Sequence, residues 1–308
     1  MTSQNNNTSD RAICGSCAII GPTNAGKSTL MNTILGTKVS IVSRKVQTTR
    51  CRIQGIYSKN NVQIVFVDTP GLFNAKQALD HAMLREVWQT LEDTDAVLLV
   101  VDASAKNGLP EQAIAKLAKR RNQDQPIFLA LNKCDDIHPK EKLLKLASHA
   151  MTLLPFTAVF MIAGKNGDGV DDIIKTIAKH LPEGPFLYPE DQVTDIPDAF
   201  QMAEITREHV FDRLHQELPY NIMVDTTKVE DAEDGSITIH QDILVMREQH
   251  KAMVIGKGAT TLKQIGAAAR HDLEHMYDTR VHLFLNVRVE ENWATKESFL
   301  MRSGLMRF

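Results

Sequence analysis

The chain has 308 residues, of which 43% are hydrophobic and 24% charged, and its formal net charge is −3. This length suits about two domains, and the near-neutral charge argues against polyanion binding by the chain as a whole. No apolar run approaches the roughly 20 residues of a membrane-spanning helix. Residues 1–11 are rich in Asn, Ser and Thr and lack a signal-peptide core, so we expect a disordered leader on a cytosolic protein.

A pattern typical of phosphate-binding loops, G-x-x-x-x-G-K-[ST], spans residues 21–28. A short apolar run precedes it, and residues 29–35 after it carry apolar side chains at helical spacing. In this context backbone N–H groups and the positive helix end bind phosphate, with Lys27 at the β- and γ-phosphates and the Ser28 hydroxyl on Mg²⁺. The expected phosphate-contacting residues are Gly21, Pro22, Thr23, Asn24, Ala25, Gly26, Lys27, Ser28 and Thr29.

A D-x-x-G motif follows two strand-like runs that the turn signal at 58–61 joins into a hairpin. The Asp68 carboxylate can hold Mg²⁺ through a water molecule, and the Gly71 N–H can approach the γ-phosphate closely. A Pro-Gly turn after a strand is common by itself, so this interpretation depends on the phosphate loop upstream. The motif comprises Asp68, Thr69, Pro70 and Gly71.

A third motif, N-K-x-D, ends the second of two buried apolar runs, 96–101 and 127–131. The Asp135 carboxylate can accept hydrogen bonds from N1–H and the exocyclic amine of guanine, whereas adenine has no matching pair of donors. Asn132 and the stem of Lys133 would brace the loop and the base. The site therefore favours GTP and GDP over adenine nucleotides.

Strands and helices alternate through the first 180 residues, which predicts an α/β P-loop NTPase domain with a mostly parallel, doubly wound sheet. All three motifs follow strand ends, so we expect them at one edge of this sheet. The spacing C-x-x-C at Cys14 and Cys17 has no second pair to complete a metal site. It runs into a strand, and we interpret these thiols as structural.

These motifs resemble those of translation-factor-type GTPases. The finer pattern Gln47-Thr48-Thr49-Arg50, together with Leu72 directly after D-T-P-G, resembles the Era family of bacterial GTPases. The resemblance implies that Thr49 binds Mg²⁺ when GTP is present, with Thr48 as the alternative. Leu72 stands where Ras-like enzymes have a catalytic glutamine, and a leucine cannot orient water by a hydrogen bond. Slow intrinsic hydrolysis is therefore expected.

The resemblance also implies a monovalent cofactor. Asn24 matches the asparagine of potassium-assisted members, in which K⁺ beside the phosphates does the electrostatic work of an arginine finger. A fifth element, Ser-Ala beneath the guanine in this family, is replaced here by Ala163 and Gly164, which we expect to contact the base through a backbone N–H. The residues expected to act in hydrolysis are Lys27, Thr49, Gly71 and Asn24.

An acidic, proline-punctuated stretch at 182–198 predicts a linker between a G domain at 12–181 and a second domain at 199–303. The second domain has the predicted order α-β-β-α-α-β and the signature V-I-G-x-x-G-x-x-[LI]-x-x-I, which indicates a smaller α+β type II KH domain. Ala259 replaces the last glycine of the G-x-x-G loop. The expected RNA-binding residues are Arg247, Gly256, Lys257, Gly258, Ala259 and Lys263.

The charge of the second domain is mixed. Residues 187–308 hold 13 basic and 21 acidic residues, whereas 245–288 hold seven basic and four acidic ones. A local basic face on an acidic module is compatible with one RNA groove. The alternative is a set of solvated helix faces around a glycine turn.

The Era resemblance covers roughly residues 12–303. It implies a GTPase that binds the 3′ end of 16S rRNA and assists maturation of the small (30S) ribosomal subunit, with peripheral contact at the inner membrane. We expect a monomer. Two alternatives stay open: a GTPase of tRNA modification or large-subunit assembly whose C-terminal module contacts protein, and a nucleotide-gated RNA chaperone whose hydrolysis only resets it.

Overall fold

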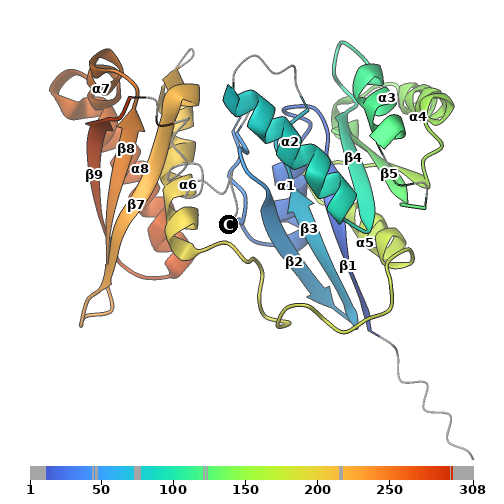
Figure 1. Ribbon diagram of the computed structural model, residues 1–308, viewed down its shortest axis with the longest axis horizontal. Coiled ribbons are helices and arrows are strands. Elements are labelled where there is room, and N and C mark those ends of the chain that lie inside the picture. The colour runs from blue at the N-terminus through green and yellow to red at the C-terminus, as the bar shows by residue number, and fades with distance from the viewer. Residues whose placement is uncertain are drawn as a thin grey trace, which may run out of the picture. The chain divides into compact units, whose positions relative to one another are not determined.

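The computed structural model describes residues 12–43, 45, 48–72, 78–120, 122, 124–214, 218–291 and 293 (Figure 1). The predicted leader at 1–11 and the last part of the predicted second domain, 294–303, lie outside these residues. The chain divides into two compact units, and each is described by itself. Of the described residues, the first unit comprises those within 12–39, 53–72 and 87–195, and the second comprises those within 40–52, 78–86 and 196–293.

The first unit is built on a six-stranded sheet in the order β2-β3-β1-β4-β5-β6. Every neighbouring pair is parallel except β2 and β3, which form the expected antiparallel hairpin. This is the predicted mostly parallel, doubly wound sheet. The strands are β1 (Ile13–Ile20), β2 (Ile53–Lys59), β3 (Val62–Asp68), β4 (Ala96–Asp102), β5 (Ile127–Asn132) and β6 (Ala158–Met161).

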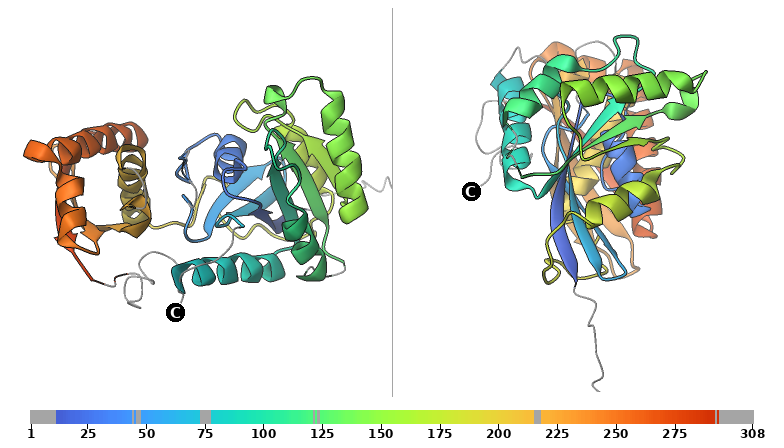
Figure 2. Two further views of the ribbon diagram at one scale, coloured as in Figure 1. Left: turned by 90° about the horizontal axis from the view of Figure 1, so that it is seen from above. Right: turned by 90° about the vertical axis from the view of Figure 1, so that its right-hand side faces the viewer.

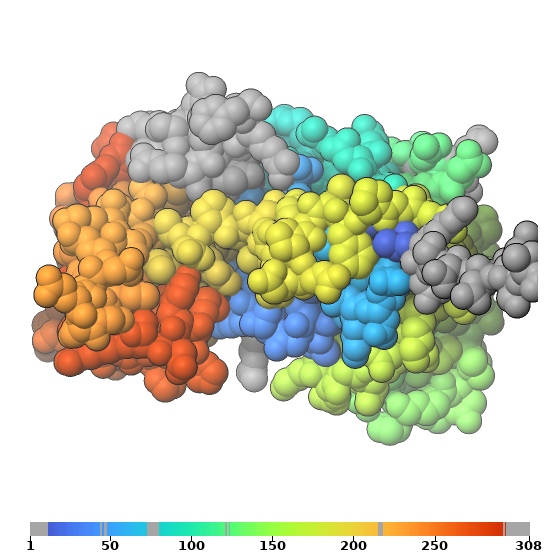
Figure 3. Space-filling model, turned by 90° about the horizontal axis from the view of Figure 1, so that it is seen from below, coloured from blue at the N-terminus to red at the C-terminus, as the bar shows by residue number. Residues whose placement is uncertain are grey.

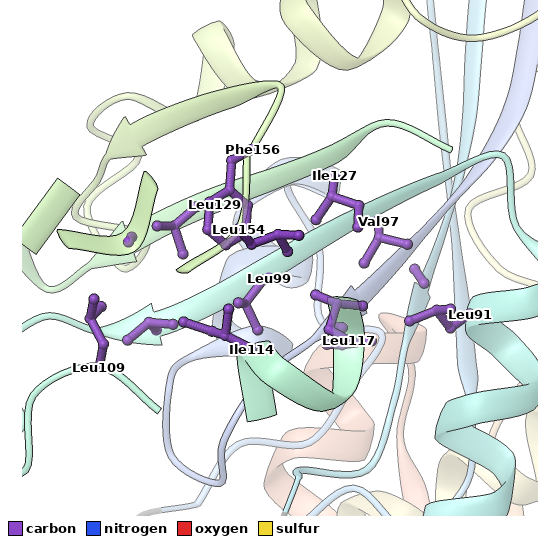
Figure 4. Packing of buried hydrophobic residues seen from close by; sticks show 14 of the residues in the cluster. Leu91, Val97, Leu99, Leu109, Ile114, Leu117, Ile127, Leu129, Leu154 and Phe156 are labelled. Atoms are coloured by element: carbon purple, nitrogen blue, oxygen red, sulfur yellow. The ribbon is translucent and has the colours of Figure 1, made fainter. Parts of the chain in front are cut away.

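Helices cover both faces of this sheet (Figure 2), which explains why its central strands are apolar without alternation. On one face, side chains of the strands pack against three helices in a continuous core that includes Leu99, Ile114 and Leu129 (Figure 4). These helices are α2 (Ala78–Asp93), of which the part from Val87 onward belongs to this unit, α3 (Glu111–Arg120) and α4 (Glu141–Leu153). Helices α1 (Lys27–Leu35) and α5 (Val170–Ala178) lie on the other face.

Residues 182–195, most of the predicted linker, belong to the first unit, where they contact β1, then Gln63 of β3, and finally the edge strand β2. We call them the edge segment (Figure 3). The Gln63 side chain accepts from the N–H groups of Leu187 and Tyr188 and donates to the Tyr188 carbonyl. Farther along, the Ile56 N–H donates to the Val193 carbonyl at 2.8 Å. These contacts give the acidic, proline-rich stretch a fixed course.

The second unit contains a three-stranded sheet in the order β7-β8-β9, in which β7 and β8 are antiparallel and β8 and β9 parallel. Its order of helices and strands is the predicted α-β-β-α-α-β, with two short 3₁₀ turns. The elements are α6 (Asp198–Arg213), β7 (Ile222–Asp231), β8 (Ile237–Val245), α7 (Glu248–Ile255), α8 (Thr260–Tyr277) and β9 (Val281–Val289).

The cysteine pair lies inside strand β1, where Cys14 and Cys17 are free and buried. Burial raises the pKa of the Cys17 thiol well above its usual range, which makes it a poor nucleophile. Among the described residues, no cluster of three or more His, Cys, Asp or Glu side chains could hold a metal ion. The described helices include none that is long and apolar enough to cross a membrane.

Candidate functional site

The phosphate loop connects β1 to α1, and its backbone conformation explains its glycines. Gly26 has φ of 93°, and a Cβ there would lie 2.4 Å from the Asn132 amide nitrogen. Gly21 has φ of 149°, and a Cβ there would lie 2.1 Å from the Val100 carbonyl oxygen. Asn24 also adopts a left-handed conformation, which asparagine tolerates better than most residues. The loop therefore lies against the ends of β4 and β5.

Lys27 is buried at the start of α1, and its Nζ donates to the Gly21 and Pro22 carbonyls at 3.2 and 3.0 Å. Burial lowers its pKa from 10.5 to about 8, and the charge of Asp68 partly opposes this shift. The ammonium group is therefore held against the loop that the sequence predicts to bind phosphate.

Ser28 and Asp68, two of the predicted Mg²⁺ ligands, meet in the first unit: the Ser28 hydroxyl donates to Asp68 Oδ2 at 2.6 Å. A hydroxyl beside a carboxylate is a hard oxygen donor set that suits Mg²⁺. The neighbouring Thr69 hydroxyl donates to the Ile19 carbonyl at 2.9 Å and fixes the start of the D-x-x-G loop on β1.

Gly71 and Leu72 lie against the phosphate loop. A Cβ at Gly71 would lie 2.6 Å from Thr23 Cγ2 and 2.9 Å from the Thr23 backbone nitrogen, so only glycine fits. The Leu72 N–H donates to the Gly21 carbonyl at 2.8 Å, while the Leu72 side chain packs against the apolar core beneath. Leu72 thus couples the two loops through its backbone and offers no polar side chain to a water molecule.

The Asn132 carboxamide joins three loops. Its Nδ2 donates to the Ala25 carbonyl at 2.8 Å, and its Oδ1 accepts from the Lys133 and Gly164 N–H groups, both at 2.9 Å. Asn132 is only 3% exposed, so these bonds are shielded from water. This one side chain fixes the N-K-x-D loop and the 163–164 turn to the phosphate loop.

Asp102 is a residue that the sequence interpretation missed. It accepts from Lys133 Nζ at 2.6 Å, and Lys133 also donates to the Asn24 carbonyl at 2.9 Å. Burial would raise the pKa of Asp102, but hydrogen bonds from Lys133 and Ser104 lower it below its usual value. The available signal was a carboxylate directly after the buried run 96–101, at the same sheet edge as the motifs.

Asp135 is exposed in the short turn after β5, as a base-reading carboxylate must be. The two N–H groups expected near guanine already have protein acceptors: Ala163 donates to the Asp168 carbonyl and Gly164 to Asn132. If guanine O6 accepts from the Gly164 N–H, it must therefore share this donor with Asn132 Oδ1.

Thr49, the third predicted Mg²⁺ ligand, lies in the second unit, where it is buried in segment 40–52. The next residue, Arg50, is 8% exposed and donates to the carbonyls of Pro219, Tyr220 and Ile222 at 2.7–3.1 Å. Burial lowers the pKa of the Arg50 guanidinium to about 9. The segment that carries Thr49 is thus bound firmly to the turn before β7.

Helix α6 adds further contacts to the same segment. Arg207, paired with Glu204, donates to the Thr48 carbonyl at 2.6 Å, and Glu208 accepts from the Val42 N–H at 3.1 Å. Lys45 donates to the last carbonyls of the helix. These contacts could not be predicted from the sequence, because the bonds to segment 40–52 join residues more than 150 positions apart.

The predicted RNA-binding loop lies between α7 and α8. Gly256 and Gly258 have positive φ, and so does Ala259, with φ of 58° and ψ of 25°. A Cβ at Gly256 would lie 2.3 Å from the Thr261 hydroxyl. Lys257 is exposed, and Arg247 precedes the first residue of α7. The structure therefore places an alanine where the left-handed conformation favours glycine.

A groove of about 470 Å³ runs between α8 and strand β9. Lys263 and Arg270 line it from the helix, with Gly266 and Ala267 between them. The small residues leave room, and the two cations offer contacts to phosphate. Strand β9 is an edge of its sheet, so one side of its backbone faces no other described strand. Groove and loop together form the candidate RNA-binding surface.

Two family models match the chain: a 50S ribosome-binding GTPase model over residues 16–133 and a KH domain model over residues 217–294. The chain is 48% identical over 292 residues to GTPase Era of Bradyrhizobium diazoefficiens, covering 95% of this chain and 94% of the relative. It is 45% identical over 291 residues to GTPase Era of Sinorhizobium medicae, covering 94% and 93%.

Two crystal structures are similar over both units, each with a TM-score of 0.88 and 35% identity. One is a variant of Aquifex aeolicus Era bound to GDP·AlF₄⁻, and the match covers 95% of this chain and 99% of the Aquifex chain. The other is Era in complex with MgGDPNP and nucleotides 1506–1542 of 16S ribosomal RNA, which covers 96% and 99%.

Fold, motifs and matches define a P-loop GTPase whose G domain is followed by a KH domain. More narrowly, the chain belongs to the Era family of GTPases. The fold class and the family resemblance expected from the sequence are confirmed. The roles assigned to individual residues stay predictions.

We expect the affinity for GTP to fall as the pH rises through about 8. The pKa of Lys27 is lowered to about 8 by burial, and only the protonated side chain attracts phosphate oxygens. Nucleotide binding should take up a proton there, so affinity should fall by at most about tenfold per pH unit. Titration of a fluorescent GTP analogue from about pH 7 to about pH 9.5 measures this slope.

The Lys27→Ala variant is the control, since its residual affinity should keep only the pH dependence of the nucleotide itself. An identical slope in both proteins would exclude Lys27 as the titrating group.

We also expect Ala259→Gly to stabilise the second unit slightly. The left-handed conformation costs an alanine roughly 1–2 kcal/mol, whereas the extra freedom of glycine in the unfolded chain costs about 0.4–1 kcal/mol. The net gain should be about 0.5–1 kcal/mol, measured by denaturant unfolding. Ala252→Gly, inside α7 and exposed, is the matched control and should destabilise. Equal destabilisation by both changes would contradict the strain at Ala259.

Proposed function

We propose that this GTPase binds the 3′ end of 16S rRNA and assists maturation of the small (30S) ribosomal subunit under the control of its nucleotide. The observation that carries the proposal is the similarity of both units together to an Era structure that contains a GTP analogue and a 16S rRNA fragment. The exposed Lys257, the groove cations and the positive-φ loop support the RNA contact.

In this proposal the first unit recognises the nucleotide. Asp135 accepts from the guanine edge, Asn132 holds the base loop on the phosphate loop, and Lys27 neutralises phosphate charge. Ser28, Asp68 and Thr49 would hold Mg²⁺, which shields the phosphate charge that develops during hydrolysis. The backbones of Gly71 and Leu72 hold the D-x-x-G loop against the phosphate loop.

We further propose that Thr49 links the nucleotide to the RNA-binding unit. Arg50 and Arg207 hold its segment on the KH half. If Thr49 binds Mg²⁺ when GTP is present, the Mg²⁺ contact and the packing of the Thr49 segment on the KH half depend on the same stretch of backbone. By linkage, GTP binding and the packing of segment 40–52 then bias one another equally.

Asn24 is proposed to ligate K⁺. Its side chain is exposed at the phosphate loop, while its backbone carbonyl is held by Lys133. Leu72 supplies no hydrogen bond to water, so transition-state charge needs another source of stabilisation.

We therefore expect GTP hydrolysis to be faster in KCl than in NaCl of equal concentration, and Asn24→Ala to remove most of this difference. The expected loss is on the order of tenfold or more, similar to the loss of one charge-stabilising group. The measurement is phosphate release with GTP saturating in both salts. Equal rates in the two salts for the unchanged protein would refute the assignment.

The RNA target is tested by crosslinking in cells followed by sequencing of the bound RNA. Reads from the 3′ end of 16S rRNA support the proposal, whereas tRNA or large-subunit reads would support the rival functions. In vitro, Lys257→Glu should weaken binding of a 16S 3′-end oligonucleotide and reduce the salt slope by about one. Lys145→Glu, an exposed change of equal charge on α4, is the control.

Cytoplasmic location, a monomeric state and peripheral contact with the inner membrane are proposed from the family alone. Separation of membrane and soluble fractions from cells tests the first and the last, and the sedimentation of the purified protein tests the second.

A further inference from the structure

The outer face of the β7-β8-β9 sheet carries an exposed aromatic side chain. Along β9, Val281 and Val287 are buried in the core beneath α8, so the residues between them alternate to the opposite face. Phe284 lies on this outer face with 55% of its surface exposed. It stacks on His240 of β8, with ring centroids 4.9 Å apart and an interplanar angle of 13°.

The two rings belong to a row across the sheet. Lys228 on β7 pairs in register with His240, and His240 pairs with Phe284. A nearly parallel second ring beneath Phe284 restricts its rotation. The row therefore presents a pre-oriented aromatic ring at β9, with the Lys228–Glu230 ion pair at its β7 end.

This surface is continuous with the groove between α8 and β9, because Phe284 also lines that groove from the β9 side, while Lys263 and Arg270 line it from α8. An RNA strand whose phosphates followed these cations would pass along the edge of β9, and nucleotides that crossed this edge would reach the outer face at Phe284.

The charges near the rings are neutralised locally. Asp242 accepts from Asn286 at 2.9 Å and from Arg288 at 3.3 Å, and Lys228 pairs with Glu230 at 2.7 Å. These paired groups offer little attraction to a phosphate, and the acidic ones oppose it. The exposed chemistry of the row is the face of an aromatic ring, which suits a base.

We propose that Phe284, supported by His240, is a stacking platform for an unpaired base of single-stranded RNA just beyond the groove. This inference rests on the proposed RNA-binding function and adds a contact on the outer face of the sheet, where Phe284 borders the groove. Stacking on an aromatic side chain tolerates any base, so the platform adds affinity and length preference more than sequence preference.

The test compares two 16S 3′-end oligonucleotides that share a groove-filling core of about four nucleotides, one of which extends by about four unpaired nucleotides on each side. Phe284→Ala should weaken binding of the long RNA by roughly 5- to 150-fold, the value of one stacked base, and leave the short RNA unchanged. Leu144→Ala, an exposed apolar residue on α4, is the control. Phe284→Trp should retain affinity, and its fluorescence should be quenched by the long RNA only.

The outcomes separate this inference from the proposed function. If the unchanged protein binds neither RNA, the proposed function fails. If Lys257→Glu weakens both RNAs and Phe284→Ala equals the unchanged protein on the long one, only the platform is refuted. A loss on both RNAs with Phe284→Ala would place the ring inside the groove and also refute the platform.

Discussion

The nucleotide site depends on one buried carboxamide. Asn132 makes three hydrogen bonds with backbone groups of three separate loops, and its amide nitrogen lies where a side chain at Gly26 would be. Because buried polar groups are costly when left unpaired, each loop stabilises the position of the other two. The phosphate loop, the base-reading loop and the 163–164 turn therefore behave as one preorganised surface. Lys133 and Asp102 extend this network to the end of β4.

The second unit depends on a different kind of contact, a buried arginine that binds backbone carbonyls. Arg50 donates to backbone carbonyls at the turn before β7 that would otherwise bind water. The aromatic rings of Phe211 and Trp293 lie over its guanidinium group, with ring centroids 5.8 and 5.7 Å away. A guanidinium suits this position because its planar fork reaches several acceptors at once. The cost of burying its charge is visible in the lowered pKa. We expect such a buried charge where the position of the chain matters for function, as proposed for the segment that carries Thr49.

The sequence predicted the elements whose causes are local. Alternating strands and helices, the motif positions at strand ends and the six-element order of the second domain all follow from periodicity and glycine placement. Ala259, which replaces the last glycine of the G-x-x-G loop, has the positive φ that a glycine would adopt more readily. Partners distant in sequence could not be foreseen. Nothing near Gln63 indicates that it binds residues 187 and 188, and the acidic, proline-punctuated composition of the edge segment predicts only a linker. The Gly164 N–H was likewise expected to be available for guanine, but the identity of its acceptor depends on how β5 and β6 align.

The edge segment has a consequence for solubility. Strand β2 ends the six-stranded sheet, and an open strand edge is a template on which other chains can add strands and aggregate. Backbone pairing at Ile56 and the Thr194 hydroxyl on the Gln54 carbonyl occupy part of that edge. The prolines of the edge segment have no N–H group to donate, so the segment is itself a poor template for a further strand. The edge segment thus shields part of a strand edge that would otherwise favour self-association.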